Sequence, residues 1–191
     1  VLARWNPYAV FAPYFGGDAG AVDAFLKEVN FHDWNLAQDA GRPFREGVAA
    51  LSAQFPHHAA AIRAYDEHWE ASITGAIEGS VEIARRLKQK GYPLYGLTNF
   101  SAEKFPLMRQ RFDFLRLFDD IIVSGEVGLI KPDPAIYDLT LRRIGYHASE
   151  CVFIDDSEAN CRAAKDKGLV TILFKNPAQL SDDLQHLGVL P

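Results

Sequence analysis

The stretch that decides the fold is residues 151–174, CVFIDDSEANCRAAKDKGLVTILF. Its apolar run at 151–154 predicts a buried strand, and two carboxylates, Asp155 and Asp156, follow directly. The pattern at 158–167 predicts a helix, and the apolar run at 170–174 predicts a second strand. A strand, a helix and a strand of these lengths are typical of a parallel βαβ unit.

The same alternation extends upstream from about residue 75. Helices are predicted at 81–90, 102–111 and 134–144, strands at 92–97 and 120–124, and a last helix from about 177. We expect Ser80 to cap the first of these helices and Gly91 to end it. This rhythm predicts an α/β core in which helices cover both faces of a Rossmann-like parallel sheet.

The first part of the chain has a different pattern. Helices are predicted at 21–29, 43–55 and 58–73, and no convincing strand pattern occurs before about residue 92. We therefore expect a helical module beside the α/β core.

Composition limits the classes of partner. The chain has 191 residues, a formal net charge of -5 and no Lys/Arg-rich block, which argues against binding nucleic acid or an anionic membrane. No apolar run approaches the roughly 20 residues that span a bilayer. Two cysteines are too few for a disulfide framework. We expect a cytoplasmic protein without a nucleic-acid or membrane partner, and its oligomeric state stays open.

Three sets of polar residues lie at, or soon after, the ends of predicted strands. Thr98 and Asn99 follow one strand, Lys131 comes soon after the next, and Asp155 and Asp156 follow the third. Ligands of open parallel sheets bind beyond the carboxyl ends of the strands. These side chains are therefore candidates for one shared site.

Each set also has an ordinary structural explanation. Thr98 or Asn99 could cap or turn the chain, and Lys131 could be a solvated charge, although Pro132 and Pro134 stiffen its loop.

Helix capping explains one acidic residue after strand 151–154 but not two, particularly because Ser157 can also cap the following helix. The pair Asp155 and Asp156 suits Mg²⁺, which binds carboxylate oxygens together with waters and a phosphate oxygen. A hydroxyl, an amide and an ammonium could hold the remaining phosphate oxygens. This set favours phosphoryl transfer, for which the missing part is a nucleophile such as an aspartate.

The order of these residues resembles the motifs of the haloacid dehalogenase-like (HAD) hydrolase superfamily. The segments LTNFS (97–101), GLIKPDPAIY (128–137) and VFIDDSEAN (152–160) are similar to motifs two, three and four. The segment WNLAQDAGRPF (34–44) resembles the helical cap, of the C1 type, in members labelled 2-haloalkanoic acid dehalogenase-like. The resemblance implies an α/β HAD core at 1–8 and 75–191 and an inserted small helical cap domain at 9–74.

The resemblance also implies roles for individual residues. Thr98 would bind the transferring phosphoryl group with Asn99 beside it, and Lys131 would neutralise the nucleophile and the phosphate. Asp155 and Asp156 would hold Mg²⁺. Asn160 would orient a carboxylate, unless it is a simple helix-surface residue, and Arg42 would contact substrate, unless it is merely solvated.

Motif one of the family is an apolar strand ending in the nucleophilic aspartate, and the resemblance places it just ahead of Val1. Asp18 and Asp23 are the nearest aspartates, but no strand precedes them. The first hypothesis is a Mg²⁺-dependent phosphatase that uses an aspartyl-phosphate on a small phosphorylated metabolite. The alternatives are a metal-independent 2-haloacid dehalogenase, acting on a small halogenated carboxylate, and a non-catalytic protein with this fold.

Overall fold

Strands and helices alternate through the second half of the protein in the computed structural model, which describes all residues 1–191. The elements are α6 (Glu78–Gln89), β3 (Tyr95–Thr98), α7 (Phe105–Arg111), β4 (Asp120–Val123), α8 (Ser124–Val127), α9 (Pro134–Ile144), β5 (Val152–Asp155), α10 (Glu158–Asp166), β6 (Val170–Leu173) and α11 (Pro177–His186). Five short 3₁₀ turns connect elements along the chain. No helix combines the length and the hydropathy needed to span a bilayer.

The strands of this half pair in parallel, as the βαβ pattern predicts. β3 pairs with β4, so that Thr98 lies opposite Val123, and β5 pairs with β6, so that Asp155 lies opposite Leu173. No ladder joins the two pairs. The expected single sheet is therefore present as two parallel pairs, and β3 and β5 each have one unpaired edge.

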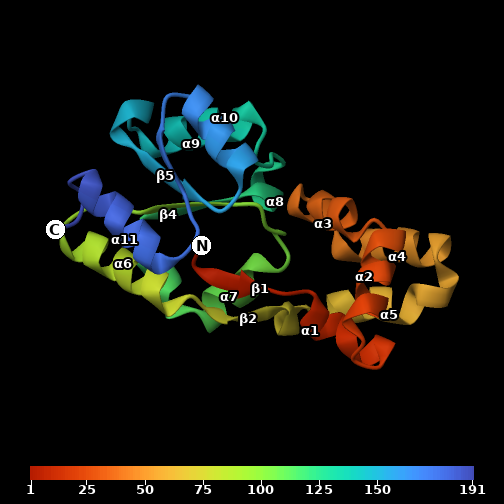
Figure 1. Ribbon diagram of the computed structural model, residues 1–191. Helices are drawn as coiled ribbons and strands as arrows, with labels where there is room; N and C mark the ends of the chain where they lie inside the picture. The colour runs from red at the N-terminus through yellow and green to blue at the C-terminus, as the bar shows by residue number, and fades with distance from the viewer.

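Helices cover these pairs from opposite sides. α9 and α10 lie beside β5, whereas α6 and α11 pack together on the other side (Figure 1). α11 and α6 share an apolar cluster with β6, to which Leu87, Ile172 and Leu184 belong. A smaller cluster around Ile136 and Tyr137 anchors α9. Burial of these faces fixes the carboxyl ends of the strands relative to one another.

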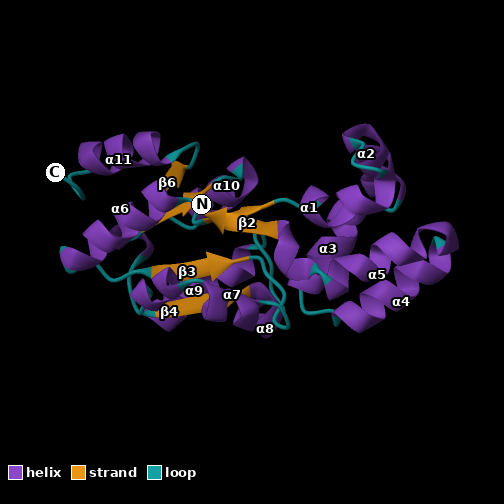
Figure 2. Ribbon diagram, turned by 90° about the horizontal axis from the view of Figure 1, so that it is seen from below, coloured by secondary structure: helices purple, strands orange, loops and turns teal.

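The first part of the chain is helical and lies at one end of the molecule (Figures 1 and 2). It contains α1 (Tyr8–Phe11), α2 (Ala19–Glu28), α3 (Phe31–Asp39), α4 (Phe44–Gln54) and α5 (Ala59–Glu67). Its residues pack in one cluster that also includes core residues such as Met108 and Val123. The division of the chain at residues 8 and 75 stays a prediction.

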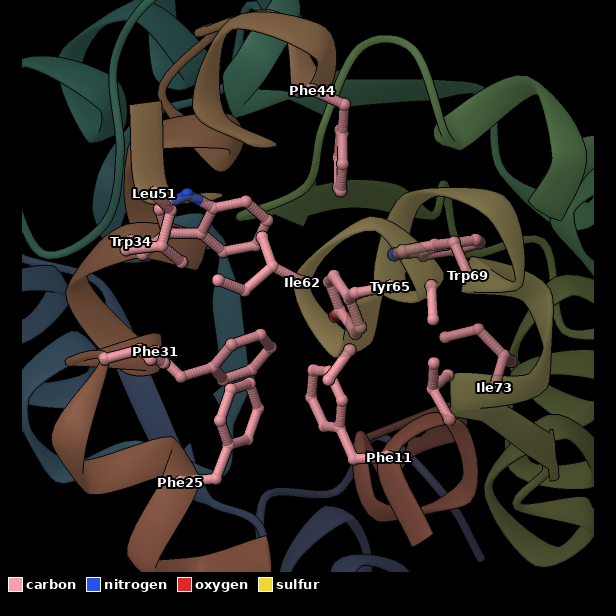
Figure 3. Close-up of a cluster of buried hydrophobic side chains, with 14 of the residues drawn as sticks. Phe11, Phe25, Phe31, Trp34, Phe44, Leu51, Ile62, Tyr65, Trp69 and Ile73 are labelled. Carbon is pink, nitrogen blue, oxygen red and sulfur yellow. The ribbon is translucent and has the colours of Figure 1, made fainter. Parts of the chain in front are cut away.

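Aromatic rings dominate the packing of this helical part (Figure 3). The ring of Tyr65 lies edge-on to Phe31, with centroids 4.9 Å apart, and stacks on Phe11 at 5.4 Å. Phe11 in turn meets Phe25 at 5.0 Å. Each such pair contributes about 0.5–1.5 kcal/mol beyond its buried area. The rings explain how short helices form a stable body.

Two short strands connect the helical part to the core, and their presence corrects the expectation of no strand before residue 92. β1 (Ala3–Trp5) pairs antiparallel with β2 (Ile73–Ala76). Each is three or four residues long, and Gly75 has a φ of 140°. Such segments lack a period-two pattern, because their pairing depends on a partner some 70 residues away.

Other boundaries differ for local reasons. The helix predicted at 58–73 ends at Glu67, because the chain turns through a 3₁₀ segment (Trp69–Ser72) into β2. Ser80 lies inside α6 and is buried, so it does not cap this helix, and its hydroxyl has no hydrogen-bond partner. β3 begins at Tyr95 rather than at residue 92.

Candidate active site

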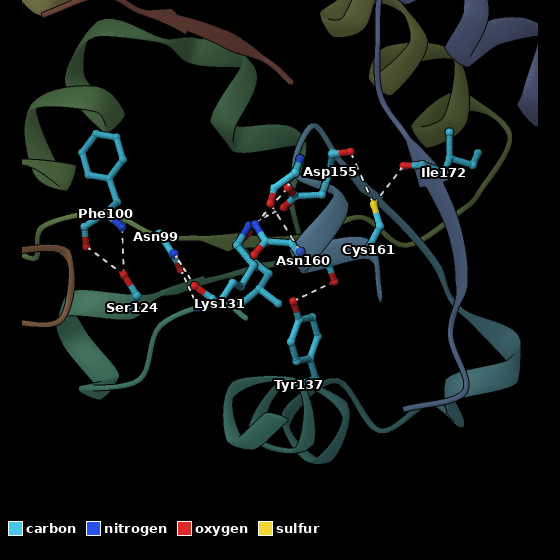
Figure 4. Close-up of polar contacts among 11 residues, drawn as sticks. Asn99, Phe100, Ser124, Lys131, Tyr137, Asp155, Asn160, Cys161 and Ile172 are labelled. Carbon is cyan, nitrogen blue, oxygen red and sulfur yellow. Dashed lines mark hydrogen bonds and ion pairs between the residues drawn. The ribbon is translucent and has the colours of Figure 1, made fainter. Parts of the chain in front are cut away.

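Asp155 is the last residue of β5 and is held at a fixed position. Its side chain is 6% exposed. One carboxylate oxygen, Oδ1, accepts hydrogen bonds from the Ser157 N–H at 2.9 Å and from the Asn160 side-chain amide at 3.0 Å (Figure 4). Ser157 also caps α10, where its hydroxyl accepts from the Asn160 N–H. The strand end and the helix start therefore orient this carboxylate together.

Lys131 bridges the ends of β3 and β5. Its ammonium group, Nζ, donates to Oδ2 of Asp155 at 2.7 Å and to the carbonyl oxygen of Leu97 at 2.7 Å (Figure 4). The lysine is only 9% exposed. A buried ion pair is retained only when its geometry and its remaining hydrogen bonds are good, since both charges lose hydration. Lys131 is therefore not a solvated surface charge.

Asn99 holds the backbone of Lys131. Its side-chain amide donates to the Lys131 carbonyl oxygen at 2.9 Å, and its side-chain oxygen accepts from the Lys131 N–H at 2.8 Å. Both ends of the amide are therefore used. This geometry indicates that Asn99 fixes the lysine loop, which is a more specific role than the sequence predicts.

Thr98 and Asp156 have free polar atoms beside this network. Asp156 is exposed, and neither its carboxylate nor the Thr98 hydroxyl makes a hydrogen bond within the protein. Both residues line a cavity of about 860 Å³ between β3 and β5. Lys131, Asp155 and Asn160 line the same cavity. Six of the seven predicted site residues, Asn99 included, thus line one cavity.

The rest of the cavity is mostly apolar. Its walls come from the facing sides of β3 and β5 and from α6, α9 and α11, and include Leu97, Ile154 and Leu184. Val1, Leu2 and Ala3 also line it. Lys131, Asp155 and Asp156 gather at the carboxyl end of the strands, whereas most of the remaining lining is hydrophobic, apart from residues such as Ser80, Thr140 and Glu150.

Arg42 lies elsewhere. Its guanidinium donates to the side-chain oxygen of Gln38 at 2.5 Å and to the Trp34 carbonyl oxygen at 3.1 Å, both within the helical part. It does not line the cavity. The structure therefore does not bring Arg42 together with the strand-end residues.

Burial changes the acidity of two groups next to Asp155. It raises the pKa of Tyr137, and the negative charge of Asp155 adds to this effect. Burial also raises the pKa of the Cys161 thiol, again with a contribution from Asp155. The Tyr137 hydroxyl donates to the Asn160 carbonyl oxygen at 2.9 Å. Both groups stay neutral and serve as fixed neighbours of the carboxylate.

Sequence reasoning missed a contact between the helical part and the core. The buried Ser124 hydroxyl, at the end of β4, donates to the carbonyl oxygen of Asp39 and accepts from the Phe100 N–H at 2.8 Å. A Cβ on Gly41 would come within 3.0 Å of the Gly125 carbonyl oxygen. The only available signal was the position of Ser124 as the last residue of a predicted strand, which did not reveal its partner.

Burial raises the pKa of Asp39 at this contact to about 7, although a hydrogen bond from the Ser101 N–H opposes the rise. The Lys104 ammonium contacts both the backbone and the carboxylate of Asp66, which adds a second link between the parts.

The donor set fits a hard divalent cation. Both Oδ atoms of Asp155 are engaged, whereas the exposed carboxylate of Asp156 is free to coordinate. Oxygen ligands of this kind are the ones that Mg²⁺ prefers, and Mg²⁺ usually takes one or two carboxylates with waters and phosphate oxygens. Asp156 is therefore the better candidate for direct ligation, and Asp155 for support.

Comparison with known proteins identifies the class to which this fold and site belong. The model of the haloacid dehalogenase-like hydrolase family matches residues 11–168. The chain belongs to this family. The predicted fold class, an α/β HAD core with an inserted helical cap, is thereby confirmed, and the protein is a member of a hydrolase family.

Individual relatives include proteins with different activities. The mouse bifunctional epoxide hydrolase 2 is 28% identical over 88% of this chain, which spans 30% of the relative. A sesquiterpene phosphatase of Aspergillus oryzae is 36% identical over 55% of this chain and 54% of its own length. The chain thus spans about a third to a half of these two relatives.

Solved structures share the fold. A HAD family enzyme from Bacteroides thetaiotaomicron, in complex with magnesium and inorganic phosphate, has a TM-score of 0.71 and 20% identity, covering 92% of this chain and 90% of that one. An L-2-haloacid dehalogenase has a TM-score of 0.61 and 22% identity, covering 88% and 80%.

Proposed function

We propose that this protein is a Mg²⁺-dependent phosphatase that acts on a small phosphorylated substrate. The observation that carries the proposal is the arrangement of Lys131, Asp155 and Asp156 at the ends of β3 and β5. One carboxylate is held by the lysine and a second is exposed and free beside it. A metal-independent reaction has no need of the second carboxylate, whereas a phosphate–magnesium site uses it.

The nucleophile in this proposal comes from a strand that lies between β3 and β5. Each of these strands has one unpaired edge, and the apolar cavity between them is lined by Val1 and Leu2. Unpaired backbone groups at a buried edge are costly, so a strand that fills the slot satisfies both edges. We place this strand in the segment that precedes Val1. An aspartate at its carboxyl end would lie near Lys131 and Asp156.

The residues then have distinct tasks. A carboxylate oxygen of that aspartate attacks phosphorus, the ester P–O bond breaks, and the leaving alkoxide takes a proton. Water then attacks the aspartyl-phosphate and releases phosphate, which restores the carboxylate. The Thr98 hydroxyl donates to a phosphoryl oxygen, and Lys131 neutralises negative charge as it develops. Asp156 would hold Mg²⁺, which would supply positive charge to offset that of the phosphate and the nucleophile.

Supporting residues complete the proposal. Asn99 fixes the lysine loop and Asn160 orients Asp155, as their hydrogen bonds support. The helical cap at 9–74 covers the core at 1–8 and 75–191 and selects the substrate. Arg42 contacts substrate only if it exchanges its bonds to Gln38 and Trp34. A cytoplasmic location is supported by the two free cysteines.

Phosphate release from p-nitrophenyl phosphate tests the proposal, with protein that includes the residues encoded ahead of Val1. We expect turnover in Mg²⁺, loss of turnover in EDTA and recovery when Mg²⁺ is restored. Halide release from a 2-haloalkanoate that continues in EDTA would contradict the proposal and favour a dehalogenase. Absence of both activities across a panel of small phosphomonoesters would favour a non-catalytic role.

A further inference from the structure

Two histidines and a glutamate meet on the helical part of the protein, outside the cavity described above. Glu28 is the last residue of α2, and His57 and His58 belong to the 3₁₀ turn Pro56–His58 between α4 and α5. Nε2 of His57 lies 3.0 Å from one Glu28 carboxylate oxygen, and Nε2 of His58 lies 3.1 Å from the other. One carboxylate therefore faces two imidazoles.

Packing fixes one of the imidazoles. The His58 ring lies edge-on to Phe25, with centroids 4.9 Å apart, and tilts against Phe15 at 6.0 Å. Its side chain is 17% exposed. Because the apolar side of the ring is buried, its Nε2 can only point outward to Glu28. Folding has therefore already restricted this imidazole, so binding of a ligand through it costs less side-chain entropy.

The outer side of the group is open to solvent. The side chains of His57 and Glu28 are 62% and 47% exposed. Waters can therefore reach any ion held there and complete its coordination. The His57 and His58 rings are tilted, with centroids 4.2 Å apart, so the two imidazoles lie beside one another.

We propose that Glu28, His57 and His58 bind a divalent transition-metal ion of the zinc type. Their ligand atoms all lie within 4.8 Å of one another. Zinc bonds to nitrogen and oxygen of about 2.0–2.2 Å place tetrahedral ligand atoms roughly 3.3–3.6 Å apart, so small side-chain rotations suffice.

The chemistry of the donors separates this site from the strand-end carboxylates. Imidazole nitrogens favour zinc and its neighbours, whereas Mg²⁺ favours oxygen ligands. The zinc-type site therefore takes an ion that the core site does not require. A bound ion also joins the end of α2 to the turn between α4 and α5, segments about 30 residues apart, and so stabilises the helical part.

Competition of tag-free, metal-stripped protein with a chromophoric chelator for Zn²⁺ tests this inference. We expect one Zn²⁺ per chain, and a dissociation constant that rises at least about tenfold in His57→Ala and in Glu28→Gln. Both positions are exposed, so neither change removes core packing. His32→Ala is the matched control, because it removes an exposed histidine of the same helical part and leaves the affinity unchanged.

A core variant excludes binding at the other carboxylates. Asp156→Asn is expected to leave Zn²⁺ affinity unchanged, and Co²⁺ in place of Zn²⁺ is expected to give visible absorption that His57→Ala abolishes. Equal Zn²⁺ affinity in wild type, His57→Ala and Glu28→Gln would overturn the inference. Loss of Zn²⁺ binding in Asp156→Asn but in no other variant would also overturn the inference. Absence of Zn²⁺ binding when the chelator concentration is lowered 100-fold would do the same. Phosphatase activity is measured separately.

Discussion

The Lys131–Asp155 pair is the residue-scale feature on which the site depends. Both side chains are nearly buried, and the lysine also contacts the Leu97 carbonyl oxygen. A partner removed from such a pair leaves an uncompensated charge in a poorly solvated place, which costs more than the pair contributed.

Lys131→Met is therefore expected to lower the free energy of unfolding by about 3–5 kcal/mol, measured by urea denaturation at pH 7. Lys167→Met is the control, since the Lys167–Asp138 pair is partly exposed and is expected to contribute only about 0–1 kcal/mol. Equal losses in the two variants would show that Asp155 is solvated after all.

Asp39 gives a pH dependence at the same scale. Burial raises its pKa to about 7, above the ordinary value of 3.8, so the folded state keeps a proton that the unfolded chain has already released. Stability from this group is complete below about pH 4 and is lost as pH rises to about 7, at a slope of at most about 1.4 kcal/mol per pH unit.

Asp39→Asn is expected to remove this slope between pH 4 and 7 in urea unfolding curves. The exposed Asp182→Asn on α11 is expected to leave it in place. A wild-type curve that is flat in that window, or parallel to the Asp39→Asn curve, would contradict the protonated state of the buried carboxyl.

At this scale the sequence predicted which polar residues approach one another and missed how they are held. Thr98, Lys131 and Asp155 were found because strand ends in a parallel sheet share one edge. The two hydrogen bonds between Asn99 and Lys131 and the bond from Ser124 to Asp39 link residues more than 30 positions apart. No local pattern contains such pairings.

At the scale of elements, the close contact between α8 and the loop at residues 100–102 allows a steric effect to be distinguished from helix propensity. Gly125 is the second residue of α8, where alanine would ordinarily stabilise the helix. A Cβ there would lie 2.5 Å from the Ala102 backbone nitrogen and 2.8 Å from the Phe100 carbonyl oxygen. Backbone atoms cannot yield as a side chain can, so the steric effect decides the sign.

Gly125→Ala is therefore expected to lower stability by about 1–3 kcal/mol, measured by thermal or urea unfolding. Gly128→Ala is the comparison, because its Cβ would meet nothing and only the positive φ of 69° opposes it. That strain costs about 1–2 kcal/mol. The two variants differ because Gly125→Ala is also expected to loosen the Ser124–Asp39 contact. This loosening is measured as faster amide exchange in residues 39–42. Unchanged exchange would contradict the contact's role.

The helix predicted at 134–144 has strong end signals and matches the structure closely, whereas the helix expected to begin after a Ser80 cap begins at Glu78. α9 runs from Pro134 to Ile144 because Asp133 caps it and Gly145 follows in the left-handed conformation. β1 and β2 lacked such signals, since each is a few residues long and forms only through the other. Propensity works where a segment decides its own structure, and fails where a distant partner decides it.

At the scale of the whole molecule, the alternation of strands and helices after about residue 75 predicted the α/β class. The lack of this alternation earlier in the chain predicted the helical insertion. The separation of β3–β4 from β5–β6 could not be predicted, because the sequence pattern of a buried strand does not depend on which strand lies beside it. The apolar cavity between the pairs and the charged cluster at one end of it bring together residues far apart in the sequence.

The proposed function also makes its claim at this scale, because it joins both strand pairs and an aspartate from the preceding segment in one reaction. Substitution of Asp156 tests this claim most directly. Its carboxylate is solvent-exposed and makes no hydrogen bond within the protein, so its removal leaves the fold unstrained.

The most direct measurement is kcat for phosphate release by Asp156→Asn, in protein that includes the residues ahead of Val1 and over a range of Mg²⁺ concentrations. We predict a loss of about a hundredfold or more with an unchanged unfolding midpoint. Glu158→Gln, an exposed acidic neighbour on α10, is predicted to retain kcat. Asp156→Asn with wild-type kcat and wild-type Mg²⁺ dependence would contradict the account.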